Sequence, residues 1–344
     1  MANSLRLSVL DQSPVSEDMT GGQALRNTID LAQLADALGY HRYWVAEHHG
    51  GPSLAGPSPE VLIGPIASST ERIRVGSGGV MLPHYSPLKV AESFSVLTGL
   101  FPGRIDLALG RASGTDPLTT FALQRDRREV APDDFPQQLV ELLGYLNDDL
   151  PAEHPFVRLA KTLPGRPETP EVWLLGSSPQ SAIWAAELGL PYSFADFINR
   201  EGAGIAEHYR KQTEDPQVSV GVWTVCAETD DAAERIASSG AMMMALLRQG
   251  RLVPVPPPEK AMRFIASEGI DLRNPHGGRR RVIGSPETVR AGIEQVANEY
   301  GAEEIILVTI TYDHEARRRS YELIADAFGL AGARETMGAA GTRR

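Results

Sequence analysis

The sequence predicts an α/β protein that closes into one (β/α)8 TIM barrel, with insertions after the fourth and seventh strands. Short apolar segments of strand type alternate with segments of helical periodicity along the whole chain. Eight strand segments, nearly all separated by helices, imply a parallel sheet, and a length of 344 residues suits a barrel with insertions. A doubly wound open sheet is the alternative that fits the same alternation.

Four strand–helix units are expected in the first part of the chain. The strands are short apolar runs at residues 5–10, 41–46, 73–76 and 105–109. Helical spacing or a helix-start signal predicts helices at residues 23–38, 58–69, 88–100 and 135–146. Gly39 ends the first of these helices, and Ser58 followed by Pro59 begins the second.

The second part of the chain continues the same alternation. Strands are expected at residues 172–175, 192–195, 218–226 and 305–310, and helices at residues 179–188, 230–247, 285–300 and 321–328. Pro-rich stretches at residues 151–170 and 251–258 are expected to be surface loops. The sequence thus predicts one TIM-barrel domain over residues 1–331, insertions at about 115–170 and 245–285, and a flexible tail at 332–344.

Composition narrows the class of protein. The net charge of −11 and the pI near 5.3 argue against nucleic acid or an anionic membrane as a partner. No run of about 18 apolar residues predicts a membrane span, and the first ten residues do not resemble a signal peptide. The single cysteine, Cys226, lies in an apolar run, which predicts a buried inert thiol and excludes a disulfide within the chain. We therefore expect a soluble cytoplasmic protein.

The active site of a βα barrel is built from the loops that follow the strands, at the end of the barrel called here the mouth. Residues that directly follow the expected strands are rich in glycine and polar side chains. They are Asp11, Gln12, Ser13, Glu47, His48, His49, Gly78, Gly79, Val80, Gly110, Arg111, Ala112, Ser113, Gly114, Gly176, Ser177, Ser178, Ser181 and Asp196.

Two of these groups predict an anion site. Gly176, Ser177 and Ser178 open a helix, with Ser181 one turn further on, and so offer free backbone N–H groups and hydroxyls. Arg111 adds a guanidinium that suits a phosphate. The alternative is that Ser177 or Ser178 only caps the helix. Neither the phosphate loop of nucleoside triphosphatases nor the dinucleotide fingerprint G-x-G-x-x-G is present.

Glycines and histidines mark two further candidate positions. Gly78 and Gly79 would let the backbone approach a flat ligand closely, or would serve a turn that needs a positive φ. Of the adjacent His48 and His49, one is expected to face the mouth and to suit proton transfer, unless Glu47 or the backbone satisfies it. No spacing of histidines and cysteines predicts a metal site. His84 is expected to be structural or to line the pocket.

At these positions the sequence resembles the bacterial luciferase-like flavin monooxygenase family. The segments that carry the resemblance are LSVLDQSP at 7–14, LADALGYHRYWVAEHH at 34–49, RIRVGSGGVMLPHYSPLKVAE at 72–92, FPGRIDLALGRASGTDP at 101–117, LLGSSPQSAIWAAELGLPYSFA at 174–195 and GSPETV at 284–289. They span most of the chain, and the fourth is the strongest.

The resemblance implies a TIM barrel that binds FMN, or the related deazaflavin F420, with the flavin ring over the strand ends. His48 would be the active-site histidine, and Gly78, Gly79 and Val80 the segment against the ring, often with a non-proline cis peptide. Arg111 would bind the flavin phosphate. The loop that contains Gly176, Ser177, Ser178 and Ser181 would bind it too. The resemblance also implies a homodimer formed through helices of the first half of the barrel.

The resemblance does not extend to light emission. The light-emitting luciferase α subunit has a cysteine at the position of Gly110 and a tyrosine near Gly114, and neither is present here. The loop after the fifth strand is also one residue longer, with Gly176 where the luciferase has an acidic residue.

The function implied is that of a monooxygenase acting on a small organic substrate. Reduced FMN from a separate flavin reductase would react with O2 to give a C4a-hydroperoxide, His48 would transfer a proton, and residues 251–258 would form a lid. An F420-dependent hydride-transfer enzyme, a non-catalytic flavin-binding protein and an unrelated barrel that binds a sugar phosphate are the alternatives. The substrate is not readable, because its specificity is expected in residues 115–135 and 245–285.

Overall fold

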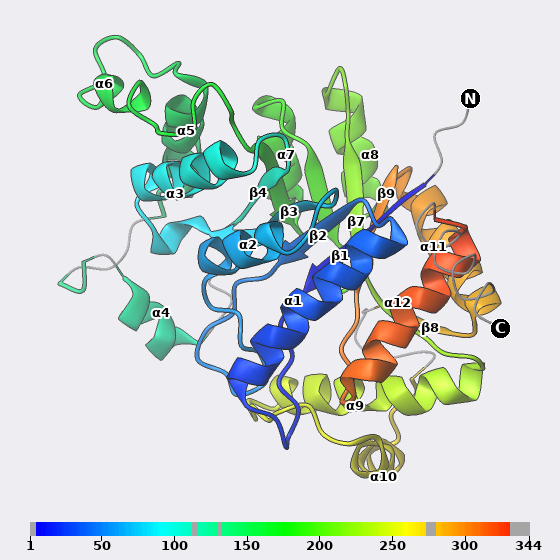
Figure 1. The fold of residues 1–344 in the computed structure, drawn as a ribbon. Helices are drawn as coiled ribbons and strands as arrows, with labels where there is room; N and C mark the ends of the chain where they lie inside the picture. The colour runs from blue at the N-terminus through cyan, green and yellow to red at the C-terminus, as the bar shows by residue number, and fades with distance from the viewer. Residues whose placement is uncertain (1–4, 112–115, 125, 129–132, 273–279, 331–344) are drawn as a thin grey trace.

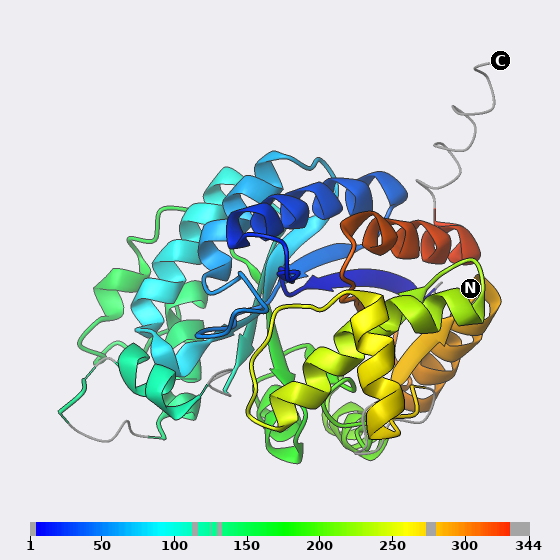
Figure 2. The same cartoon turned by 90° about the horizontal axis from the view of Figure 1, so that it is seen from below.

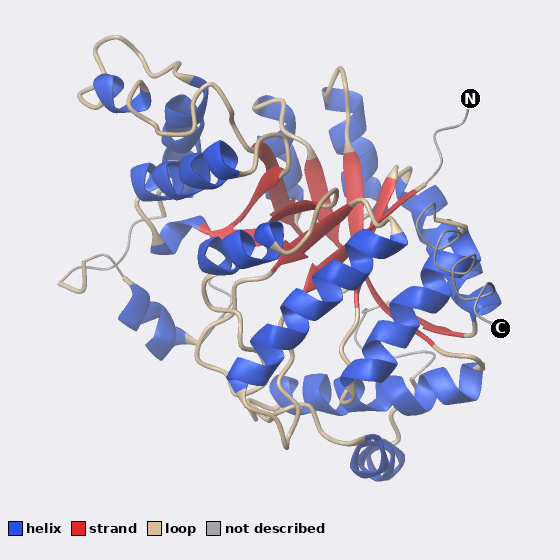
Figure 3. Cartoon of the chain, viewed as in Figure 1, coloured by secondary structure: helices blue, strands red, loops and turns tan. Residues whose placement is uncertain are grey.

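The computed structural model of the chain describes residues 5–111, 116–124, 126–128, 133–272 and 280–330. Eight of its nine strands form a closed parallel barrel in the order β1-β2-β3-β4-β5-β6-β7-β9, since β6 pairs with β7 and β9 pairs with β1 (Figure 3). Closure confirms the predicted TIM barrel and excludes the open sheet. The strands are β1 Arg6–Asp11, β2 Arg42–Val45, β3 Arg74–Met81, β4 Ile105–Gly110, β5 Glu171–Gly176, β6 Tyr192–Ala195, β7 Val218–Cys226, β8 Arg281–Gly284 and β9 Glu304–Val308.

Helices surround the barrel and lie between consecutive strands (Figure 1). Each of the longer ones buries one stripe in the protein interior and leaves the opposite face in water. The helices are α1 Gly21–Leu38, α2 Pro59–Ser68, the short 3-10 helix η1 Leu82–His84, α3 Pro87–Leu100, α4 Pro117–Leu123, α5 Phe135–Asn147, α6 Val157–Ala160, α7 Pro179–Glu187, α8 Ala203–Gln212, α9 Asp230–Arg248, α10 Pro258–Glu268, α11 Pro286–Tyr300 and α12 His314–Phe328. Within the described ranges, none of them is both long and apolar enough to cross a bilayer.

Some element predictions were wrong in extent. β3 runs on through Gly78, Gly79 and Val80, which therefore lie within the strand and do not follow it. The last helix begins at His314, seven residues before the predicted start at Tyr321, because Asp313 caps it. The predicted flexible tail at 332–344 lies outside the described residues.

Six elements of the described structure were not predicted: β8, the 3-10 helix η1 and helices α4, α6, α8 and α10. β8 has four residues and pairs only with the end of β7, so it is too short to show a period. α8 buries only Ala206 and Tyr209, which gives a weak amphipathic signal.

Insertions follow the fourth and the seventh strand, as predicted. Residues between β4 and β5 include α4, α5 and α6, and residues between β7 and β8 include α9 and α10. Helices α4, α9 and α10 lie at the same end of the barrel, the lower end in Figure 1, and Figure 2 looks onto that end. The second insertion packs against itself through α9 and α10. The insertions therefore add walls around the mouth.

A charged cluster fills the opposite end of the barrel. Arg42 donates from Nη1 to Asp106 Oδ2 at 2.8 Å and from Nε to Glu304 Oε1 at 2.8 Å. Arg74 binds the second oxygen of Asp106 at 2.5 Å. Arg42, Asp106 and Glu304 are buried. Above this floor, apolar side chains close the interior, so the open space of the barrel is confined to the mouth. They are Leu10, Trp44, Ala46, Ala108, Trp173, Ile306 and Val308.

Candidate active site

A cavity of about 530 Å³ opens at the mouth of the barrel. Strand ends, the loops that follow them, and the insertion after β7 all contribute to its wall. The lining residues are Gln12, His48, His49, Gly51, Ser53, Leu54, Asp116, Phe197, Ile198, Trp223, Met243, Met244, Leu247, Gly250, Arg251, Leu252, Val253 and Val308. The wall is mostly apolar with few polar groups, which is the usual character of a small-molecule site.

His48 reaches this cavity from the end of β2. Its backbone N–H donates to Gly56 O at 3.0 Å, which fixes the loop that carries it. Its Nδ1 is buried, and no described residue offers it a hydrogen bond. Burial, together with His49, lowers the pKa of His48 to about 4. The imidazole is therefore neutral at pH 7, and its buried Nδ1 is left without a hydrogen-bond partner among the described residues.

His49, although adjacent, is held by its neighbours. Its Nε2 lies 2.7 Å from Glu47 Oε1, and the other oxygen of Glu47 accepts from the backbone N–H of Met81 at 2.8 Å. The ring of His84 packs edge-on against that of His49, with centroids 5.9 Å apart. The sequence left open that Glu47 binds the histidine at the mouth. In the structure Glu47 binds His49 and not His48. His84 has the packing role that was one of its two expected roles.

Gly78 and Gly79 bring β3 unusually close to its neighbours. The peptide bond between them is cis, and the register with β4 shifts between Gly78 and Val80. A Cβ on Gly78 would lie 2.6 Å from Leu10 Cδ1, and one on Gly79 would lie 2.6 Å from Ala108 O. Neither has a positive φ, so the alternative that they serve such a turn is wrong. They are glycines because no side chain fits at this end of the strand.

Arg111 and the start of α7 form a second polar group at the same end of the barrel. Arg111 follows β4, and its guanidinium carbon lies 5.6 Å from the centre of the Trp184 ring of α7. Ser178 is the N-cap residue of α7, yet its side chain makes no capping hydrogen bond, and Pro179 occupies the first turn. The capping alternative therefore fails for Ser178, and the helix presents uncapped N–H groups at the same end of the barrel as Arg111.

Ser181 faces the inside of its own loop. Its Oγ donates to Ser178 O at 2.8 Å and lies 3.0 Å from Tyr192 Oη. Gly176 packs directly against this hydroxyl and has no room for a Cβ. In the structure, Ser181 and Gly176 shape the loop that carries Ser177 and Ser178.

Two acidic residues of the predicted mouth are engaged in buried pairs. Asp11 binds Arg317 at 2.7 Å and accepts from Tyr43 Oη at 2.5 Å. Asp196 accepts from Tyr300 Oη at 2.7 Å and lies 3.4 Å from Arg280 Nε. These pairs fasten the ends of β1 and β6 to the surrounding helices. Ala112, Ser113 and Gly114, also expected at the mouth, lie outside the described residues.

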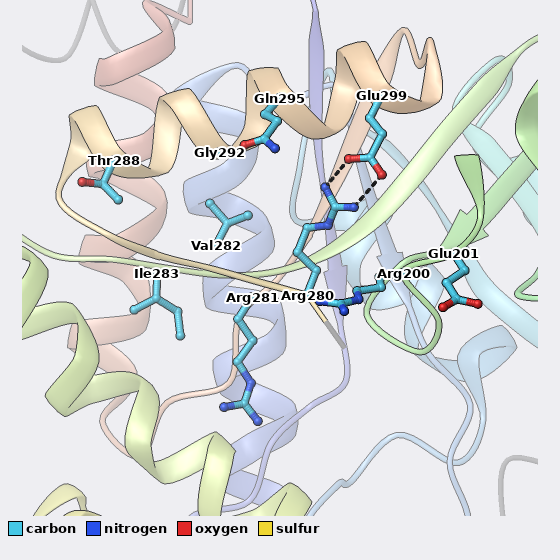
Figure 4. Close-up of a pocket in the computed structure, with 10 residues that line it drawn as sticks. All are labelled: Arg200, Glu201, Arg280, Arg281, Val282, Ile283, Thr288, Gly292, Gln295 and Glu299. Atoms are coloured by element: carbon cyan, nitrogen blue, oxygen red, sulfur yellow. Dashed lines mark hydrogen bonds and ion pairs between the residues drawn. The ribbon is translucent and has the colours of Figure 1, made fainter. Parts of the chain in front are cut away.

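A second cleft lies beside the barrel at β8 and α11 (Figure 4). Arg280 points to Glu299 of α11 and makes two hydrogen bonds to it, at 2.7 and 2.9 Å, while Arg281 points the opposite way. Because Glu299 and Asp196 both bind Arg280, the charge of that guanidinium is compensated within the protein. Arg280 is therefore engaged within the protein and is not presented to a ligand of this cleft.

Sequence reasoning missed most of the cavity wall. Trp223 of β7 lines the cavity, as do Phe197 after β6 and the end of α9. The consecutive Met242, Met243 and Met244 were the available signal, since methionines often line adaptable binding surfaces. Among the described residues, no cluster of histidine, cysteine or acidic side chains could hold a metal ion.

Comparison with known proteins matches the chain to one family. The family model described as luciferase-like monooxygenase matches residues 5–304. An uncharacterized Bacillus subtilis protein, YwcH, is 45% identical over 94% of this chain and 98% of its own. The N-acetyl-S-alkylcysteine monooxygenase of the same organism is 37% identical over 94% of this chain and 98% of its own.

Solved structures agree with these relatives. The crystal structure of apo-MsnO8 superposes with a TM-score of 0.86 at 40% identity, over 95% of this chain and 98% of the other. Two more distant structures share the fold. One is the oxygenating constituent of the 3,6-diketocamphane monooxygenase of Pseudomonas putida in complex with FMN, with a TM-score of 0.71 at 20% identity over 94% of this chain and 97% of the other. The other is an F420-dependent secondary alcohol dehydrogenase, with a TM-score of 0.62 at 13% identity over 94% of this chain and 99% of the other.

Proposed function

This chain belongs to the luciferase-like monooxygenase family, and we propose that it is a monooxygenase that uses reduced FMN and O2 on a small organic substrate. The observation that carries the choice of cofactor is the uncapped N-terminus of α7, which follows β5, together with Arg111, which follows the neighbouring strand β4. Backbone N–H groups at a helix start, together with a guanidinium, suit the phosphate of FMN.

The residues at the mouth fit such a cofactor in three places. Arg111, Ser177 and Ser178 would hold the phosphate. Gly78 and Gly79 would offer backbone without side chains to the ring. Reduced FMN, when bound, supplies the electrons that activate O2.

The protein's own residues would orient the reactants and control protons. His48 would donate or accept a hydrogen bond through its buried Nδ1, the polar atom that the fold leaves without a partner. The apolar wall from α9 and residues 251–253 would exclude water from the reaction. Residues 251–258 would then serve as the lid that the sequence indicated.

The cofactor is tested by titrating the purified protein with FMN, riboflavin and F420 at equal concentrations. We expect FMN to bind about tenfold or more tightly than riboflavin, which lacks the phosphate, and Arg111→Ala to remove that difference. An affinity for FMN that Arg111→Ala leaves unchanged would refute the phosphate site. Tighter binding of F420 than of FMN would favour a hydride-transfer enzyme.

The reaction is tested by O2 uptake with FMN and a flavin reductase that supplies its reduced form. We expect candidate substrates to give a product only when O2 is present, and His48→Ala to reduce kcat by roughly 10²-fold or more. Turnover that continues without O2 would favour the F420 alternative. FMN binding without turnover by any reductant would indicate a non-catalytic flavin protein.

We also propose a homodimer formed through α2 and α3. Val61 and Val96 are exposed by 66% and 47% and line one groove between these helices, with Leu100 exposed by 66% one turn further along α3. Covering such a patch in a second copy would remove apolar surface from water. Sedimentation should give a dimer for the wild type and a monomer for Val96→Glu.

The cysteine fits a cytoplasmic location, which we also propose. Cys226 is buried and free, burial raises the pKa of its thiol to about 12, and such a thiol suits the reducing cytoplasm.

A further inference from the structure

We propose that the mouth cavity binds an organic anion with an apolar body, and that Arg251 holds its anionic headgroup. This proposal rests on the proposed function, because it names the substrate class of the same site. It depends on three features of the cavity, which are its exposed apolar side chains, the Arg251 guanidinium that no described carboxylate binds, and the fixed backbone that carries Arg251.

The cavity exposes apolar side chains that a ligand would cover. Ile198, Leu247 and Leu252 are exposed by 48%, 43% and 45%, and all three line the cavity. Met243 and Met244 complete this wall with flexible side chains that adapt to ligands of different shape. A hydrocarbon body would bury these side chains and gain the free energy of removing apolar surface from water.

The cavity presents one guanidinium that no described carboxylate binds. Apart from its two histidines, the described lining has two ionisable side chains, Asp116 and Arg251. The carboxylate of Asp116 accepts from the N–H groups of Leu118 and Thr119 at 2.9 and 3.1 Å, and is therefore engaged at the start of α4. The Arg251 guanidinium forms no ion pair with a carboxylate of the described residues. It is therefore available to an anionic group of a ligand.

Arg251 is held in place at both ends of its segment. At the end of α9, Gly250 has φ of 73°, and Arg251 N donates to Leu246 O at 2.9 Å, which is the Schellman arrangement that ends a helix. Four residues later, Val255 N donates to Val15 O at 2.8 Å, and Glu17 N donates to Val255 O at 3.0 Å. The backbone of Arg251 is thus fixed at the cavity rim, which limits the entropy lost when its side chain binds a ligand.

The test is equilibrium dialysis of radiolabelled octanoate, 1-octanol and octylamine against the purified protein, with and without saturating FMN, at pH 7.5. The three probes share one hydrocarbon body and differ in headgroup charge. We expect octanoate to bind about tenfold more tightly than 1-octanol, because a charge-assisted hydrogen bond to Arg251 is added, and octylamine to bind most weakly.

Variants assign the preference to Arg251. Arg251→Gln should remove the preference for octanoate over 1-octanol, and Arg251→Lys should retain most of it. Arg263→Gln, on an exposed position of α10 outside the cavity, should leave this preference unchanged. Equal affinity for octanoate and 1-octanol in the wild type would overturn the proposal. A preference that survives in Arg251→Gln would overturn it as well.

A third measurement separates this proposal from the proposed function. Arg251→Gln should leave the affinity for FMN unchanged, while Arg111→Ala should weaken it. If Arg251→Gln weakens FMN binding as Arg111→Ala does, Arg251 serves the cofactor phosphate and the substrate proposal is wrong. Failure of the proposed function would appear as absent FMN binding or absent O2 uptake, neither of which the octanoate dialysis measures.

Discussion

At the scale of single residues, the mouth shows how neighbours in sequence acquire different roles. His48 and His49 are adjacent and both line the cavity, but Glu47 binds only His49. His48 keeps a buried nitrogen without a described partner, which is costly unless a ligand satisfies it. Such a group marks a site of function more specifically than the presence of a histidine does.

The burial of His48 predicts a pH dependence of stability. Its pKa is about 4 in the folded protein and near 6.5 in the unfolded chain, so the unfolded chain binds the proton first as the pH falls. His48 therefore destabilises the fold progressively below pH 6.5 and has no such effect above it. Between pH 7 and pH 4.5, His48→Gln should gain about 1–3 kcal/mol in free energy of unfolding relative to the wild type, measured by urea denaturation. A difference that does not change with pH would contradict this.

The close approach of Gly79 to β4 predicts that a side chain here is not tolerated. In Gly79→Ala the new Cβ would meet Ala108 O at 2.6 Å and Leu175 Cδ1 at 2.8 Å. We expect a loss of about 1–3 kcal/mol in free energy of unfolding by urea denaturation. Gly204→Ala is the matched control, because nothing lies within 4 Å of its Cβ in α8, and it should be neutral or slightly stabilising.

At the scale of elements, the insertion after β7 provides the wall of the cavity. α9 ends at the cavity, and residues 251–253 continue its wall before the chain reaches Val255. Val255 is fully buried and packs with Trp223, Met243 and Ile310. The segment that the sequence indicated as a mobile loop is thus anchored at one buried residue.

Weakening that anchor should loosen the cavity wall without unfolding the barrel. Val255→Ala removes buried apolar contacts, so the segment should open locally more often, and trypsin should cleave after Arg251 about tenfold faster. Val253→Ala, which changes a partly exposed side chain of the same segment, should leave the cleavage rate near that of the wild type. Equal cleavage rates in the two variants would show that Val255 is not the anchor.

At the scale of the whole molecule, the barrel separates stability from function at its two ends. The floor is a buried network in which Arg42 binds Asp106 and Glu304, and the mouth holds the groups that are available to ligands. This is the usual division in a TIM barrel.

Removing Arg42 should destabilise the entire barrel. Arg42→Met would leave the buried carboxylates of Asp106 and Glu304 without their main partner, at a cost of about 3–5 kcal/mol in free energy of unfolding. Lys211→Gln breaks the exposed pair with Glu207 and should cost less than about 1 kcal/mol. Urea denaturation of both variants checks this, and similar losses in the two would show that the floor network contributes no more than a surface pair.

The sequence by itself determined the barrel and the direction of its mouth. Alternating strand and helix periods are local signals, and a polar residue directly after a strand lies at the mouth in any βα barrel. The positions of His48 and Arg111 at the mouth follow from these local signals alone. The ends of the strands were less well predicted. The sequence placed Gly78 and Gly79 after the third strand, because glycines lack the apolar signal that marks a strand, but the structure places them within β3.

Only the tertiary structure decided which of these groups are available and what surrounds them. Glu47 binds His49 and not His48, the hydroxyl of Ser181 makes a hydrogen bond within its own loop, and Asp196 pairs with Arg280. The rim at Arg251 depends on Val255 pairing with residues 15 and 17, more than two hundred positions away in the chain. Such contacts have no periodicity and no local motif, since they arise only when the barrel brings distant loops together at its mouth.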